Sequence, residues 1–197
     1  YLMSRIDEII NEIKRLDDEL LAEIQKKEEE FFYKIKGKKI LFEEEARKYQ
    51  KEFMIRVSTY LSNASFLHIL TVPVIWSCII PAFILDLFAS IYQTICFIVY
   101  KIPLVKRSKY VVIDRNSLSY LNAIEKINCV YCGYFNGVIA YIQEIAARTE
   151  QYWCPIKHAR KIITMHSRYN KFIQYGDCPD YQKRLKQLRE DFQDIED

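Results

Sequence analysis

Apolar residues recur at alternating intervals of four and three over the first part of the chain. This heptad spacing keeps one stripe of a helix facing a partner and is typical of a coiled coil. The stripe consists of Leu2, Ile6, Ile9, Ile13, Leu16 and Leu20. A break at 36–38 follows, and a second periodic stretch then contains Phe42, Ala46, Tyr49, Phe53, Val57 and Tyr60. We therefore predict a helical hairpin or coiled coil over residues 1–62.

The partner of this coil is open at the level of sequence. The next seam positions are Glu23, Lys27 and Glu30, so the apolar stripe is shorter than three heptads. It could pair within the chain or between subunits. We expect it to form a homo-oligomer or to bind a partner membrane protein.

Residues 66–105 form a strongly apolar run in which Asp86 is the only charged residue between Ile69 and Val99. A bilayer-spanning helix needs roughly 20 apolar residues, and Pro73 and Pro81 can each break a helix. We predict two segments, Phe66–Ile80 and Ala82–Tyr100, that form a re-entrant or two-pass membrane hairpin. The alternative is a buried core hairpin of a soluble protein.

The flanks of the run and its one charge suggest how it lies in a membrane. Basic residues precede it at Arg47, Lys51 and Arg56 and follow it at Lys101, Lys106, Arg107 and Lys109. Positive charge on both sides favours two cytoplasmic ends, so we expect a membrane protein whose C-terminal part faces the cytoplasm; in a bacterium this is the inner membrane. Asp86 should face protein or a polar cavity, or lie at the turn of the hairpin.

The C-terminal third is predicted to be a helical bundle over 110–178, followed by an amphipathic helical tail over 180–197. One helix should begin near Ser117 after a capping Asp114 or Asn116. Glycines at 133 and 137 separate it from a second helix over about 138–151. A third helix should follow Pro155 and run over about 156–172. The whole chain is thus expected to be all-α.

Composition narrows the possible functions. Half of the 197 residues are hydrophobic and 14% are aromatic, which excludes a disordered chain. Only four glycines are present, which argues against a turn-rich β-sandwich. The net charge is +3, so bulk charge gives no reason to expect nucleic acid as a partner. The expected partner is the lipid bilayer.

The clearest chemical signal is Cys129-x2-Cys132 followed by Cys154-x3-His158. Without a secretory signal at the start of the sequence, we expect such cysteines to bind metal or to do redox chemistry rather than to form a structural disulfide. Three thiolates and one imidazole suit a tetrahedral site for Zn²⁺ or Fe. We predict that these four residues bind one metal ion.

The expected helices place a geometric condition on this site. If residues 138–151 are all helical, they cover about 20 Å and separate the two pairs. The pairs then meet only if the second helix is shorter, if the CxxC loop folds back, or if two subunits share the site. A rival site takes Cys178 with Cys129 and Cys132, and leaves Cys154 and His158 to another site with nearby glutamates.

The same residues lie in two recognisable blocks, NCVYCGYFNG over 128–137 and RTEQYWCPIKHA over 148–159. With these blocks, residues 110–161 resemble an uncharacterised family of small bacterial membrane-associated proteins with NCxYCxYxNG and RTEQYWCPIKHA motifs. The resemblance implies that Cys129, Cys132, Cys154 and His158 belong to shared motifs, which favours the four-ligand site. It implies no known reaction.

Three functional hypotheses follow from the sequence. The first is a membrane-anchored metal-binding protein. The second is a coiled-coil interaction protein at the membrane, with a purely structural zinc ion or no metal. The third is a metal-dependent enzyme at the membrane surface, which needs an open coordination position.

Overall fold

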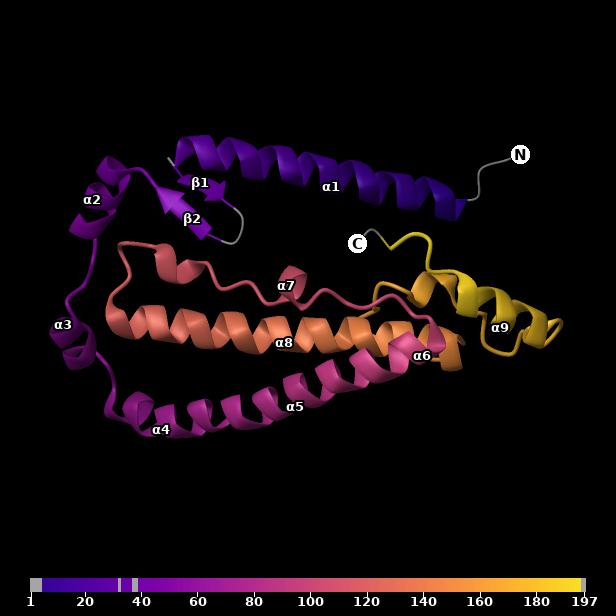
Figure 1. Ribbon diagram of the computed structural model, residues 1–197. Helices are drawn as coiled ribbons and strands as arrows, with labels where there is room; N and C mark the ends of the chain where they lie inside the picture. The colour runs from indigo at the N-terminus through magenta and orange to yellow at the C-terminus, as the bar shows by residue number, and fades with distance from the viewer. Residues whose placement is uncertain (1–4, 32, 37–38, 196–197) are drawn as a thin grey trace. The chain divides into compact units, whose positions relative to one another are not determined.

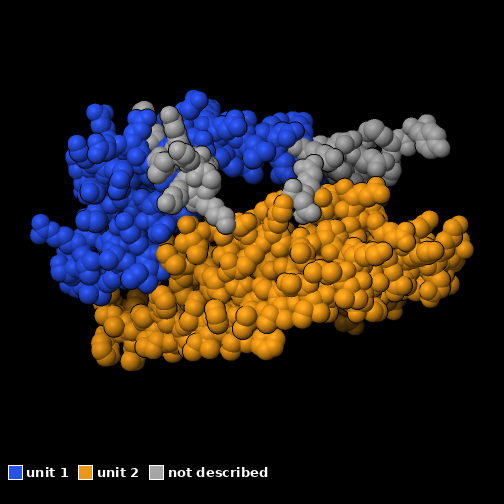
Figure 2. Space-filling view, in the orientation of Figure 1, with its two compact units in different colours: residues 1–62, 114–127 blue, residues 63–113, 128–197 orange. Residues whose placement is uncertain are grey.

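The computed structural model describes residues 5–31, 33–36 and 39–195, without the side chains of 5–11, 14, 34–36, 39 and 41. The described chain is mainly helical, as expected (Figure 1). It forms two compact units. Unit 1 comprises Tyr1–Ser62 and Asp114–Ile127, and unit 2 comprises Asn63–Ile113 and Asn128–Asp197 (Figure 2).

Unit 1 begins with a long helix but does not continue as a simple helical hairpin. Helix α1 (Arg5–Glu30) is followed by the antiparallel strands β1 (Tyr33–Lys36) and β2 (Lys39–Phe42). Tyr33 pairs with Phe42, and their rings lie 5.6 Å apart. Aromatic or β-branched residues alternate with lysines in β1, and β2 contains three consecutive apolar residues, so this segment favours a β-hairpin over the direct helix–helix turn that we predicted.

The second predicted helix of this region is interrupted. Helix α2 (Glu44–Glu52) and helix α3 (Val57–Ser62) are separated by residues 53–56. A short 3-10 turn, η2 (Arg115–Ser117), also belongs to this unit. Ser119 N–H donates to Gln50 Oε1 at 3.0 Å, which ties the segment after η2 to α2.

Much of the apolar stripe of α1 is exposed within the described chain. Ile13, Leu16 and Leu20 are each at least 51% exposed. The side chains of Leu2, Ile6 and Ile9 lie outside the described residues. The helix that the heptad predicts is present, and its pairing as a coiled coil stays a prediction.

Unit 2 begins with one long helix instead of the predicted hairpin. It consists of α4 (Phe66–Ser77), α5 (Ile79–Tyr92), the π-helical turn η1 (Gln93–Phe97) and α6 (Ile98–Tyr100). Pro73 is accommodated inside α4, and Pro81 falls in the first turn of α5, where its missing N–H is least costly. The reverse turn expected at Pro81 therefore does not form. Among the described residues, Phe66–Tyr100 is the one helix long and apolar enough to cross a membrane.

A return segment, defined as residues 101–113, connects this helix to the next long one. Lys101 ends α6 with a left-handed φ of 57°. The segment contains the short helix α7 (Arg107–Tyr110) and runs back along the helices. Helix α8 (Ala123–Trp153) then runs in the same direction as α4–α6 (Figure 1). Ring contacts between Trp76 and Tyr131 and between Tyr100 and Tyr152 join corresponding ends of the two helices.

Helix α8 replaces two predicted helices, because its glycines do not break it. An added Cβ at Gly137 would lie 2.8 Å from Tyr110 O and from Val111 Cα. This position is glycine because the return segment passes directly over the helix, and not because the chain turns there. The core of unit 2 lies along this contact and contains Phe97, Ile102, Val105, Tyr141, Ile145 and Phe192.

The predicted third helix over 156–172 does not form. After Trp153 the chain is irregular, and Ile156 forms a parallel β-bridge with Ile173. A 3-10 turn, η3 (Tyr169–Lys171), and the helix α9 (Tyr181–Glu190) follow. Leu185 and Phe192 are buried, so the predicted amphipathic tail is helical over α9 and packs on unit 2.

Candidate functional site

The two halves of the predicted metal site lie at opposite ends of α8. Cys129 and Cys132 are in the N-terminal third of the helix, and Cys154 directly follows its last residue. A continuous helix from 132 to 153 separates them by about 30 Å at 1.5 Å per residue. The geometric condition stated for this site is thus not met within one chain, because neither glycine interrupts α8.

The remaining ligand candidates do not complete a site either. All six cysteines are free thiols, and Cys132, Cys154 and Cys178 are exposed. Among the described residues, no three His, Cys, Asp or Glu side chains lie close enough to hold one metal ion. This holds for the set with Cys178 as well as for the set with His158. Within the part of the chain that the structure describes, Cys129 and Cys132 thus have no further ligands beside them.

His158 and His166 instead flank Tyr169. The His158 ring is stacked on the tyrosine ring at 6.4 Å, and the His166 ring meets it edge-on at 5.6 Å. The Tyr169 hydroxyl accepts a hydrogen bond of 3.0 Å from the backbone N–H of His158. His166 Nδ1 accepts from Arg168 N–H at 3.2 Å, and its Nε2 lies 3.1 Å from Glu150 without hydrogen-bond alignment. These contacts fix the loop between the two histidines.

Asp86 is the clearest polar feature of the apolar helix. Arg107 of the return segment donates to its carboxylate through Nε at 3.0 Å and through Nη2 at 2.7 Å. Tyr134 of α8 donates to the same carboxylate at 3.0 Å. Asp86 is 7% exposed, so this charge in the apolar run faces protein and not a hairpin turn. Hydrogen bonding to Asp86 raises the pKa of Arg107, and burial beside that carboxylate raises the pKa of Tyr134.

A second polar anchor lies about two turns further along, at the π-helical turn. The Gln93 side chain accepts from Val105 N–H at 2.9 Å and donates to Val105 O at 3.3 Å. It also donates to the Tyr141 hydroxyl. The wider π turn presents this amide to the backbone of the return segment and satisfies polar groups that are buried there. The return segment is thus fixed to the helix by Arg107 and by Gln93.

A buried polar network joins the C-terminal region to α8. Arg148 forms an ion pair with Glu144 at 2.9 Å and donates to the carbonyl oxygen of Pro103 at 2.8 Å. Gln151 is fully buried and donates to the carbonyl oxygens of Leu188 and Asp191 at 2.8 and 2.7 Å. The sequence does carry a signal for this network. Three polar residues, Glu144, Arg148 and Gln151, lie at i, i+4 and i+7 and so share one face of α8 with Tyr141.

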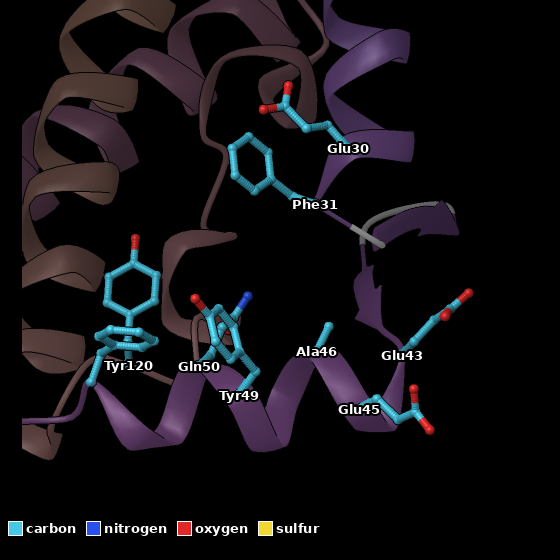
Figure 3. Close-up of a pocket in the computed structure, with 9 residues that line it drawn as sticks. Glu30, Phe31, Glu43, Glu45, Ala46, Tyr49, Gln50 and Tyr120 are labelled. Atoms are coloured by element: carbon cyan, nitrogen blue, oxygen red, sulfur yellow. The ribbon is translucent and has the colours of Figure 1, made fainter.

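An aromatic-lined pocket with a volume of about 660 Å³ lies in unit 1. The pocket occupies the space between α2 and the end of α1, and three side chains point into it, those of Phe31, Tyr49 and Gln50 (Figure 3). Tyr120 also lines the pocket. The lining also includes Glu30, Glu43, Glu45, Ala46 and Phe53. None of these nine residues is a histidine, cysteine or serine, so the lining lacks the usual nucleophile–base pair. The pocket suits an apolar occupant better than a reaction.

No model of a known protein family matches the chain, and no curated protein or solved structure is similar to it. The interpretation of the site therefore depends on geometry and chemistry.

Proposed function

We propose that this protein is a membrane-anchored protein whose α4–α6 helix lies lengthwise in the cytoplasmic face of the bilayer. One observation carries the proposal. The side of the helix that faces away from α8, called here the outer arc, is almost entirely apolar, and its exposed Thr94 donates its hydroxyl to the backbone carbonyl oxygen of Ser90. Its members are Ile80, Phe83, Ile84, Leu87, Phe88, Ile91, Ile95 and Ile98, each 47% exposed or more.

The extent of the outer arc argues against ordinary exposure in water. A helix of 35 residues is about 52 Å long. Single exposed apolar side chains are normal, but continuous apolar patches of more than a few hundred Å² mark interaction or membrane surfaces. Helix α4 continues the patch with Phe66, Leu67 and Leu70, each at least 62% exposed. Lipid is the occupant that suits a surface so long and so free of polar groups.

The opposite side of the helix argues against a perpendicular span. Asp86 and Gln93 face the return segment, whose backbone is irregular. This backbone is hydrogen-bonded to side chains, at Val105 to Gln93 and at Pro103 to Arg148. Irregular backbone is not tolerated against lipid in the hydrocarbon region. Basic residues flank both ends of the helix, which fits two ends on one side of the membrane. A helix that lies in the plane of the interface satisfies both conditions.

Flotation with neutral phosphatidylcholine vesicles, without detergent, tests the anchoring. The intact chain is expected to float. Ile84→Lys with Ile91→Lys puts two charges on the outer arc and should lower the floating fraction about tenfold or more, because a lysine inside the bilayer is strongly disfavoured. Ile139→Lys with Gln143→Lys, on exposed positions of α8, adds the same charge and should still float. An intact chain that stays in solution, or equal losses in both variants, would contradict the anchoring.

The orientation has a separate test. Single cysteines placed at Ser65 and at Lys101 mark the two ends of the helix. In sealed vesicles with the protein added from outside, an impermeant thiol reagent should label both positions. Labelling of one end only would indicate a perpendicular span instead of the lengthwise arrangement.

A second candidate function is assembly through α1. What supports it is the exposed apolar stripe of Ile13, Leu16 and Leu20 on a helix of 26 residues. Ile13→Asp with Leu20→Asp should reduce the assembled mass measured by light scattering in detergent. Ala22→Asp with Gln25→Asp adds the same charge beside the stripe and should leave the mass unchanged. A monomeric intact chain would exclude this function.

A further inference from the structure

A loop after α8, defined as residues 157–168 and called here the basic loop, is held firmly at its base. Lys157 N–H donates to Ile173 O at 2.7 Å, and Ile173 N–H donates to Pro155 O at 2.8 Å. Tyr169 lies against both His158 and His166, as described above. Loops whose ends are close and packed in this way are compact surface elements that commonly bind partners.

The tip of the basic loop is apolar and fully open. Ile163 is 99% exposed and Met165 is 63% exposed. An isoleucine that keeps nearly all of its surface in water gives up the stabilisation that burial provides. Its neighbours Ile162 and Thr164 lie at the same tip. The base of the loop therefore holds an aliphatic tip away from the protein.

The sides of the basic loop are positively charged. From Gln151 to Gly176 the chain contains no aspartate or glutamate. Arg168 and Lys171 in this stretch pair with Asp194 and Asp191. By contrast, Lys157, Arg160 and Lys161 make no ion pair with any described carboxylate. Three basic side chains of the loop thus lack an ion-pair partner among the described residues, while Glu150 and Glu144 contact His166 and Ser167 at the end of the loop.

We infer that the basic loop docks on an anionic lipid surface, with Ile163 and Met165 inserted among the head groups and the three basic residues on the lipid phosphates. An aliphatic tip flanked by Lys and Arg is the chemistry of interfacial membrane binding. The inference rests on the proposed anchoring, and it adds a second contact with a preferred lipid class.

Continuity with the outer arc supports a bilayer as the occupant. The loop leaves the C-terminal end of α8, where the Trp153 ring lies 5.3 Å from the Tyr100 ring at the end of α6. Trp153 is 50% exposed, and Ile98 and Val99 beside it are at least 65% exposed. Tryptophan and tyrosine are enriched where protein meets the bilayer interface. The basic loop therefore begins next to residues that already suit the interface.

Limited trypsin digestion of the full chain tests the inference, because Arg160 and Lys161 are themselves cleavage sites. The chain is bound to vesicles of phosphatidylcholine alone, or to vesicles that also contain roughly 30% phosphatidylglycerol. Mass spectrometry gives the cleavage rate at each site. Cleavage after Arg160 and Lys161 should be about tenfold slower on the anionic vesicles than on the neutral ones. Cleavage after Lys183 and Lys186 in α9 should differ little and serves as the internal control.

Two variants separate the contributions of the tip and of the charge. Ile163→Ser with Met165→Ser should remove most of the protection, because the tip can no longer insert. Lys157→Gln should reduce protection several-fold, since each basic residue near an anionic surface changes partitioning roughly fivefold. Lys183→Gln removes the same single charge elsewhere, is the matched charge control and should leave protection at the loop unchanged. Raising the salt from about 50 mM to about 500 mM should weaken protection by screening.

The outcomes distinguish this inference from the anchoring. A chain that floats on both kinds of vesicle while the loop is cleaved equally fast on both overturns the inference and leaves the anchoring in place. Equal protection on neutral and anionic vesicles also overturns it, because the lipid class is then not recognised. A chain that floats on neither kind of vesicle overturns the anchoring and the inference together.

Discussion

At the scale of single residues, the ion pair between Asp86 and Arg107 has unequal partners. The Asp86 side chain is 10% exposed and the Arg107 side chain is 43% exposed. Without Asp86, the guanidinium can turn to water, whereas without Arg107 the carboxylate stays buried with only the neutral hydroxyls of Tyr134 and Ser90 beside it. Arg107→Gln should therefore lower the free energy of unfolding by about 2 kcal/mol, and Asp86→Asn by about 1 kcal/mol. Urea unfolding in mild detergent measures both. A larger loss for Asp86→Asn would contradict this account of burial.

Gly137 permits a close contact between two backbones. Gly→Ala inside a helix normally stabilises by roughly 0.5–1 kcal/mol. Here the new methyl group would meet the backbone at Tyr110 and Val111, which cannot turn away as a side chain could. Gly137→Ala should therefore destabilise unit 2 by about 1–3 kcal/mol. Gln143→Ala, at an exposed position of α8, is the control for helix propensity and should be close to neutral in the same thermal melts.

Asp194 makes the C-terminal region sensitive to acid. Burial alone would raise its pKa, but hydrogen bonds from Arg168 and Lys171 hold the pKa of Asp194 well below its usual range. A carboxyl group with a lowered folded-state pKa contributes its stability above the unfolded-state pKa, about 3.9, and loses it as the pH falls toward the folded-state value. Asp194→Asn should therefore destabilise at pH 7 by on the order of 1 kcal/mol, since the side chain is half exposed. The difference in melting temperature between the intact chain and the variant should begin to shrink below about pH 4 and should keep shrinking through pH 3 and lower. A difference that persists undiminished in acid would refute the assignment.

At the scale of elements, periodicity predicted helices well and their ends poorly. The heptad predicts α1, and the apolar run predicts helical segments over 66–80 and 82–100, which the structure joins into one helix. The errors arose at residues with two physical roles. Pro81 was interpreted as a break, but a proline in the first turn of a helix costs little. Gly137 was interpreted as a turn, but it allows the return segment to pass close to α8. Such tertiary contacts have no local signal in the sequence.

The predicted metal site also depends on tertiary contacts that have no local signal in the sequence. Spacing identified Cys129 with Cys132 and Cys154 with His158 as two local pairs, and each pair is close in sequence. Whether the pairs meet depends on the length of α8, which in turn depends on the contact at Gly137. The buried network around Gln151 and Arg168 was missed for the opposite reason. Its polar residues belong to segments 17 to 43 positions apart and acquire a role only when they pack.

A distance measurement tests the separation of the two pairs. Spin labels at Cys132 and Cys154, with the other four cysteines changed to serine, should give a main distance of about 30 Å or more. A distance below about 15 Å would mean that α8 bends back and that one chain can hold all four ligands. Zinc content offers a second check. With the pairs apart, Cys154→Ser with His158→Ala should leave any zinc bound through Cys129 and Cys132 unchanged.

At the scale of the whole molecule, the two units differ in what their surfaces offer. Unit 1 has the exposed stripe of α1 and the aromatic-lined pocket beside α2. Unit 2 contains the long apolar helix, the core centred on Phe97 and Tyr141, and the basic loop. Every member of that core lies in unit 2. The division suggests that assembly and membrane contact are separate properties of the chain.

Removal of residues 1–62 tests this separation. The remaining chain retains all residues of the unit 2 core and of the outer arc, so it should keep a cooperative thermal transition and float on neutral vesicles like the intact protein. It loses the apolar stripe of α1 and should lose any assembled mass that depends on it. Circular dichroism melts, flotation and light scattering measure the three properties on one preparation. Loss of the thermal transition would show that the segment 114–127, which belongs to unit 1, needs its N-terminal partner for α8 to fold. A chain that melts normally but no longer floats would place the membrane contact in unit 1 and overturn the role given to the outer arc.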